Sequence, residues 1–194
     1  MKAKLFYLLT SNFHLYTFIF TLSPFHYFTI MNKKTQLIVI AHRIRSLYNV
    51  GSIFRTCDAL GVEKLYLTGY TATPEQKPIQ LHKTALGAEQ IVSWEHSRNI
   101  GTVLAKLKQH GYQIIGIEEK KGISQDFRTW KPTKKTAIIL GNEIYGIHAR
   151  TLKKCDQIIH LPMRGSKKSL NVAVAFGAIG YYMAAQTGSR TAHA

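Results

Sequence analysis

The hydrophobic residues of the chain fall into short, nearly continuous runs that are separated by longer stretches of mixed polarity. The runs cover residues 37–41, 64–68, 112–117, 136–140 and 157–161. Most of them lack the alternation of hydrophobic and polar residues that is typical of a strand with one exposed face. They therefore predict strands of a parallel sheet whose two faces are both covered.

In the stretches between these runs, hydrophobic residues recur at the spacing of a helix. The predicted helices cover residues 50–60, 96–110, 148–154 and 170–186. Gly61 and Gly111 directly follow the first two, at positions where a glycine ends a helix with little steric cost. Residues 71–78, which contain two prolines, predict an exposed loop. The alternation of strands and helices predicts a single α/β domain.

Residues 1–30 differ in composition from the rest of the chain. They are rich in Phe and Tyr and contain no acidic residue, and the apolar run at 5–22 is typical of a signal peptide or membrane anchor. Ser11, Asn12 and His14 interrupt this run, and no small-residue cleavage site follows it. Met31 opens a more conventional start. We therefore expect residues 1–30 to be a translated leader and residues 31–194 to form the domain.

Positive charge dominates the composition. The 194 residues include 26 Lys and Arg against 10 Asp and Glu, which gives a formal net charge of +16. Such an excess favours an anionic partner, and we expect nucleic acid rather than a membrane surface. Cys57 and Cys155 are too widely separated to predict a disulfide framework or a zinc site. We therefore expect no metal and a reducing, cytoplasmic location.

Ligands of an open parallel sheet bind beyond the carboxyl ends of its strands, so the residues after each run are candidates for chemistry. After the first run, Asn49 is a candidate N-cap, and Gly51 and Ser52 would leave room for a phosphate at the start of the helix. The arginines of this segment are Arg43, Arg45 and Arg55. They form either an anion-binding group or a solvated basic face.

Two later segments have similar features. Gly141 and Glu143 follow the fourth run, where the glycine would allow close approach of a ligand; an ordinary turn is the alternative. The loop after the last run is basic and leads into a helix that Ser169 or Asn171 would cap. The small residues of that helix would let another backbone approach, although they also suit interior packing. The chain has no GxGxxG after its first strand, no P-loop and no HExxH.

Taken in order, NVGSIFRT, LGNEIYGI and HLPMRGSKKSLNVAVAFG resemble the three motifs of the SpoU (TrmH-type) RNA 2′-O-ribose methyltransferases of the SPOUT superfamily. The resemblance extends over residues 36–185 and leaves residues 1–30 without a counterpart, which favours Met31 as the start. It implies a parallel-sheet α/β fold with a deep trefoil knot near the C-terminus, an exception to the rule that chains do not thread loops. It also implies a homodimer whose site is completed across the subunit interface.

The family binds S-adenosylmethionine with its last helix and the loops of its second and third motifs. The matching cofactor positions are Leu140, Gly141, Ile159, Leu161, Met163 and Leu170. The matching catalytic positions are Arg55, Asn49, Glu143, Ser169 and Asn171. Arg55 would orient the ribose hydroxyl and stabilise the developing alkoxide, while Glu143 would hold Asn49 or Arg55 in place. The polar pair of the third motif would bind substrate or support the pocket.

The resemblance thus implies transfer of a methyl group from S-adenosylmethionine to a ribose 2′-hydroxyl of tRNA or rRNA. The residues that we expect to bind the RNA are Arg43, Arg45, Arg164, Lys167 and Lys168. One alternative is a non-catalytic knotted RNA-binding protein, for example one that acts in ribosome assembly. A membrane-tethered protein that uses residues 5–22 is another, although we expect no stable membrane association.

Overall fold

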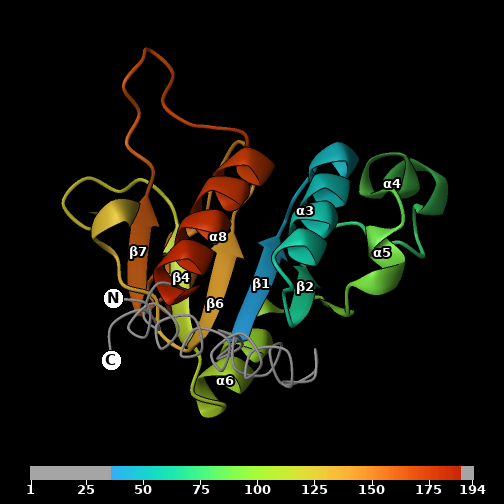
Figure 1. Cartoon of the computed structure of the whole chain (residues 1–194), viewed down its shortest axis with the longest axis horizontal. Coiled ribbons are helices and arrows are strands. Elements are labelled where there is room, and N and C mark those ends of the chain that lie inside the picture. The colour runs from blue at the N-terminus through green and yellow to red at the C-terminus, as the bar shows by residue number, and fades with distance from the viewer. Residues whose placement is uncertain (1–35, 189–194) are drawn as a thin grey trace, which may run out of the picture. The chain divides into compact units, whose positions relative to one another are not determined.

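A computed structural model describes residues 36–188 of the chain (Figure 1). The predicted leader, its apolar run and Met31 lie outside the described residues. Seven strands form one sheet in the order β3-β2-β1-β6-β4-β7-β5, and every pairing between them is parallel. The predicted parallel α/β domain is therefore confirmed for this part of the chain.

The bounds of the elements follow the hydrophobic runs closely. The strands are β1 (Gln36–His42), β2 (Lys64–Thr68), β3 (Trp94–Ser97), β4 (Gln113–Ile117), β5 (Gln125–Asp126), β6 (Lys135–Leu140) and β7 (Gln157–His160). The helices are α3 (Leu47–Ala59), α4 (Pro78–Ala85), α5 (Ala88–Ile91), α6 (Ile100–Gln109), α7 (Ala149–Leu152) and α8 (Val172–Gly188), with a 3₁₀ turn η1 at Phe127–Thr129.

Each face of the sheet has its own hydrophobic core. Val39 and Ala41 of β1 belong to a cluster with α3, α4, α5 and α8, and Ile38 and Ile40 belong to one with α6 and α7. This division follows from the alternation of side chains along a strand. Figure 1 shows α3 and α8 side by side on the same face of the sheet. The prediction of a sheet that is covered on both faces is therefore confirmed.

The start of α3 differs from the prediction. The helix begins at Leu47, and its N-cap is Ser46, whose hydroxyl accepts a hydrogen bond from the Asn49 N–H at 3.4 Å. The prediction that Asn49 is the cap was therefore wrong. Gly51 does not leave room for a phosphate either, because a Cβ there would lie 1.9 Å from Thr84 Oγ1 and 2.9 Å from the Ala85 nitrogen of α4. Its role is to let α3 and α4 approach closely.

We expect Gly51→Ala to destabilise the domain by about 1–3 kcal/mol, because the added methyl would force α4 away from α3. The measurement is the free energy of unfolding in urea. Ser52→Ala is a matched control in the same turn, and its effect should stay within about 0.5 kcal/mol. Equal stability of the Gly51→Ala variant and the wild type would show that the close approach of the two helices has no energetic importance.

Other differences concern short or half-buried segments. The predicted helix at 96–110 begins only at Ile100, where Asn99 is the cap and accepts a hydrogen bond from Gly101 at 2.8 Å; residues 94–97 form β3 instead. Helices α4 and α5 were not predicted, and α7 is shorter than expected. The loop at 71–78 is not exposed throughout. Thr71 is buried, and its hydroxyl accepts a hydrogen bond from the Ile44 N–H at 3.0 Å.

Within residues 36–188, no helix combines the length and the apolar character that a membrane crossing requires.

Candidate active site

The carboxyl edge of the sheet contains a hollow of about 380 Å³. Its walls come from the segments after β4, β6 and β7 and from the start of α8. Figure 1 shows the segment between β7 and α8 rising beyond the strand ends. The hollow lies where ligands bind in open parallel sheets, and its volume is typical of sites for small molecules.

Most of the predicted cofactor positions line this hollow. The lining positions among them are Gly141, Leu161, Met163 and Leu170. Leu140 and Ile159 do not line it, because their side chains lie in the core of the sheet with 1% and 0% exposure. The structure therefore brings four of the six positions to the hollow and places the other two directly behind its walls.

A chain of hydrogen bonds joins residues from all three motifs. Asn49 donates from its side-chain amide to Glu143 Oε1 at 2.8 Å. Asn171 donates from its amide to Asn49 Oδ1 at 2.9 Å, and its own Oδ1 accepts from the Ala173 N–H at 2.9 Å. Of the two predicted caps of α8, Ser169 and Asn171, the structure shows Asn171 in that role. The chain Glu143–Asn49–Asn171 lines the hollow.

The Glu143 carboxylate occupies the start of α3, where a phosphate had been expected. Besides Asn49, it accepts hydrogen bonds from the backbone N–H groups of Arg45 and Ser46, each at 3.0 Å. Burial raises the pKa of Glu143, but these hydrogen bonds outweigh it, so the pKa lies below its ordinary value. The carboxylate is therefore ionised at neutral pH. The structure shows it holding Asn49, and it shows no bond to Arg55.

This lowered pKa predicts how stability responds to acid. Because the folded-state pKa lies below the ordinary value of 4.5, the stabilisation from the Glu143 carboxylate is fully present above that pH. It is lost as the pH falls below 4.5 through the folded-state pKa. In urea unfolding at a series of pH values, the stability difference between wild type and Glu143→Gln should shrink as the pH falls through this range. A difference that does not change with pH would contradict the assignment.

Asn142 organises the loop that carries Glu143. Its amide group donates to the Arg43 carbonyl at 2.9 Å and lies 3.0 Å from the Tyr70 hydroxyl. Its Oδ1 accepts from the N–H groups of Ile144 at 2.9 Å and Tyr145 at 2.8 Å. Arg43 itself has a positive φ of 58°, and its guanidinium carbon lies 5.1 Å from the centre of the Tyr70 ring. A single buried amide thus joins the ends of β1, β2 and β6.

We expect Asn142→Asp to cost about 2–3 kcal/mol of stability, because it places a carboxylate oxygen against the Arg43 carbonyl. Tyr70→Phe removes one hydroxyl and should cost about 1 kcal/mol. Urea unfolding at neutral pH measures both. If Asn142→Asp is no less stable than Tyr70→Phe, the amide does not organise this loop.

Gly141 is crowded by its own loop. A Cβ there would lie 2.7 Å from the carbonyl carbon of Gly146 and from the nitrogen of Ile147. The Ile147 N–H in turn donates to Glu118 Oε2 at 2.6 Å. The glycine was expected to admit a ligand, and the structure shows that it is already needed for the close return of the chain.

The hollow also contains residues that the sequence analysis missed. Glu118 and Glu119 follow β4, and His160 ends β7. Ligands of parallel sheets bind beyond the carboxyl ends of the strands, and the two acids come directly after the run at 112–117. The same reasoning would therefore have identified both acids as candidates. Asn142 lies between two residues that were singled out, but nothing in its sequence context distinguishes it from an ordinary turn residue.

Arg55 is set apart from the other predicted catalytic residues. It is exposed on α3 and does not line the hollow, whereas Ser169 does. Of the residues predicted to bind RNA, Lys168 lines the hollow. The others are exposed: Arg43, Arg45, Arg164 and Lys167.

The described part of the chain offers no group of His, Cys, Asp and Glu side chains with metal-binding geometry. Cys57 and Cys155 are both free. Burial raises the pKa of the Cys155 thiol to about 11, so this thiol is protonated at neutral pH.

Comparison with known proteins points to one family. The model of the SpoU rRNA Methylase family matches residues 36–181. A tRNA (guanosine(18)-2′-O)-methyltransferase of Aquifex aeolicus is 36% identical over 149 residues, which cover 77% of this chain and 69% of the relative. The enzyme of the same name from Escherichia coli K12 is 33% identical, and the match covers 77% of this chain and 63% of the relative.

The fold also matches solved structures. The SpoU methyltransferase AviRb from Streptomyces viridochromogenes, in complex with AdoMet, superposes with a TM-score of 0.73 at 28% identity. That match covers 81% of this chain and 60% of the relative. The chain therefore spans less than two thirds of the length of two of these three proteins.

Proposed function

Since the chain belongs to the SpoU rRNA methylase family, we propose that it transfers a methyl group from S-adenosylmethionine to a ribose 2′-hydroxyl of tRNA or rRNA. The observation that carries this proposal is the hydrogen-bonded chain Glu143–Asn49–Asn171 in the wall of the hollow. It joins one polar residue from each of the three motifs at one place. A binding protein without catalytic activity would not need that arrangement.

The composition of the hollow fits the cofactor. Leu161, Met163 and Val172 supply an apolar surface that suits an adenine ring, and the carboxylates of Glu118 and Glu119 can accept hydrogen bonds from hydroxyl or ammonium groups. When bound, S-adenosylmethionine supplies an electrophilic methyl group on its sulfonium.

The remaining residues position the acceptor. Glu143 fixes the orientation of the Asn49 amide, and Asn171 fixes it from the other side. A guanidinium offers five N–H donors and no acceptor, so Arg55 serves as a donor to the hydroxyl and to a neighbouring phosphate rather than as a base. It thereby stabilises the negative charge that develops on the 2′-oxygen while the hydroxyl proton passes to solvent water.

We further propose that the protein is a homodimer in which Arg55 completes the hollow of the partner subunit. Two observations support this. Arg55 is exposed and lies outside the hollow of its own chain. Helix α8 is apolar on all sides, yet Val174 and Tyr181 are 57% and 58% exposed, which is typical of a helix with a covered face in an oligomer.

Mixing two inactive variants tests the shared site. Arg55→Ala and Glu143→Gln subunits, mixed in equal amounts and allowed to exchange, should recover about a quarter of the wild-type activity, because half of the dimers then contain one intact site. If Arg55 acts within its own chain, no intact site forms and no activity returns.

The trefoil knot implied by the resemblance is part of the same proposal. Strand β7 pairs with β4, whereas α8 packs against α3, so the segment between β7 and α8 crosses the carboxyl ends of β4 and β6. This crossing supports a threaded chain.

The full-length chain, incubated with tritiated S-adenosylmethionine and total RNA from a strain that lacks the gene, should transfer tritium to tRNA or rRNA. Absence of transfer, with cofactor and RNA both bound, would favour a non-catalytic RNA-binding protein instead.

A further inference from the structure

A second hollow of about 360 Å³ adjoins the first, and Arg45, Ser46, Glu143 and Ile144 line it. Glu143 and Ile144 also line the first hollow, so the two hollows meet at these residues. The backbone N–H groups of Arg45 and Ser46 are already bonded to the Glu143 carboxylate. The Arg45 side chain is exposed and remains available to a ligand.

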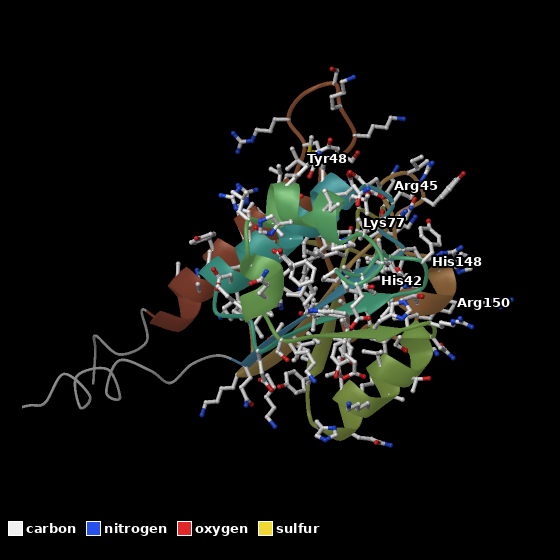
Figure 2. All side chains as sticks on the ribbon, turned by 90° about the vertical axis from the view of Figure 1, so that its right-hand side faces the viewer. His42, Arg45, Tyr48, Lys77, His148 and Arg150 are labelled. Atoms are coloured by element: carbon white, nitrogen blue, oxygen red, sulfur yellow. The ribbon has the colours of Figure 1, made fainter. Side chains whose placement is uncertain are left out.

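Basic side chains from separate segments lie on the same side of the molecule as Arg45, which lines the second hollow. Figure 2 shows Arg45, Lys77, His148 and Arg150 on the same side of the molecule, together with Tyr48. All five are exposed. The ion pairs between described residues include none of Arg45, Lys77 and Arg150. His148 Nδ1 accepts a hydrogen bond from the Arg150 N–H at 3.3 Å. Glu75 is exposed two residues before Lys77, and Glu143 is occupied by its three donors, so the surface carries a net positive charge.

Two exposed tyrosines lie close along the chain to residues that line the second hollow. Tyr48 is 70% exposed near the start of α3, and Tyr145 is 80% exposed next to Ile144 at the second hollow. The Tyr145 N–H is bonded to Asn142, which fixes the backbone that presents the ring. Phosphate-binding cations interleaved with exposed aromatic rings are typical of surfaces that bind single-stranded nucleic acid.

We propose that this surface, formed by Arg45, Tyr48, Lys77, Tyr145, His148 and Arg150, binds an unpaired RNA segment on either side of the nucleotide that enters the second hollow. Arg45, Lys77 and Arg150 contact phosphates, the His148 ring can donate a hydrogen bond from Nε2, and the two tyrosine rings stack on bases. Such stacking requires bases that have left a helix, so the substrate is a loop or single strand rather than a continuous duplex. The inference rests on the proposed function, because it assumes that RNA is the substrate.

The test measures binding of the full-length chain to a fluorescein-labelled RNA hairpin with an unpaired loop, and to the blunt duplex of the same stem. Lys77→Ala/Arg150→Ala should bind the hairpin about tenfold more weakly and reduce the slope of log affinity against log salt by about 1–2. Tyr145→Ala should weaken hairpin binding about tenfold and leave duplex binding nearly unchanged.

Lys131→Ala/Lys134→Ala is the matched control, since it removes the same charge from exposed lysines just before β6, at the opposite edge of the sheet. It should change hairpin affinity by less than about twofold. S-adenosylmethionine affinity serves as the measure of folding in every variant. The proposal is overturned if both double variants weaken binding equally, or if Tyr145→Ala weakens duplex binding as much as hairpin binding.

Methyl transfer by the wild type, measured beside RNA binding by the surface variants, distinguishes failure of this inference from failure of the proposed function. Hairpin binding that depends on Lys77, Arg150 and Tyr145, without methyl transfer, would support the surface and refute the enzyme. Methyl transfer by a wild type whose surface variants bind the hairpin normally would support the enzyme and refute the surface.

Discussion

Arg55→Ala should lower the rate of methyl transfer by about 10²–10³-fold while leaving S-adenosylmethionine affinity close to that of the wild type. The guanidinium is the donor that we assign to the developing alkoxide, so its loss affects the transition state. It does not line the hollow of its own chain and is exposed on α3, so its removal leaves the walls of that hollow intact.

Single-turnover rates with saturating RNA, together with calorimetric titration of the cofactor, separate these two effects. Arg55→Lys keeps the positive charge but lacks the planar set of N–H donors of a guanidinium. It should recover only a small part of the rate that Arg55→Ala loses. Arg98→Ala removes another exposed arginine and serves as the control. Loss of rate and cofactor binding together would mean that Arg55 supports the fold and does not act on the acceptor.

The second large effect is expected for Glu143→Gln, which should lower the rate about a hundredfold and also weaken cofactor binding. The carboxylate accepts hydrogen bonds from two backbone N–H groups and from Asn49. A glutamine can accept with one oxygen only and turns an NH₂ group toward donors, so at least one donor loses its partner. The Asn49 amide then loses its fixed orientation, and the link to Asn171 is disturbed with it.

The same kinetic and calorimetric measurements apply to this variant, with Glu75→Gln as the control because Glu75 is exposed outside the hollow. Asn49→Asp should reproduce much of the loss, since it places two carboxylates in contact. If Glu143→Gln transfers methyl groups at the wild-type rate, the hydrogen-bonded chain is structural and plays no part in the reaction.

The sequence was informative about the fold where burial dominates. Strands β1, β4 and β6 are continuous hydrophobic runs because both faces of the sheet are covered, and their predicted positions were nearly correct. Strand β3 was not predicted, and its last two residues were assigned to a helix, because it lies at the edge of the sheet and its four residues are only half buried. Strand β5 contains only Gln125 and Asp126, so no hydrophobic pattern could reveal it.

The candidate site was predictable only in part. The resemblance identified Asn49, Glu143 and Asn171, but their mutual bonds join residues 94 and 122 positions apart, which spacing along the chain cannot reveal. The misplaced N-cap has the same origin. Asn49 is a favourable cap by residue type, yet its side chain bonds to Glu143 and Asn171, and Ser46 caps the helix. The position of Arg55 outside the hollow depends on the direction of α3, which the sequence does not specify.

The chemical position of the transferred methyl group distinguishes ribose methylation from base methylation. The direct measurement is mass spectrometry of nuclease-digested RNA after reaction with the full-length chain and isotopically labelled S-adenosylmethionine. The proposed function predicts label on a ribose 2′-oxygen, where it also blocks alkaline cleavage of the adjacent phosphodiester. It predicts that Arg55→Ala forms this label about 10²–10³-fold more slowly. Label on a base, or 2′-O-label that persists at the wild-type rate in Arg55→Ala, would contradict it.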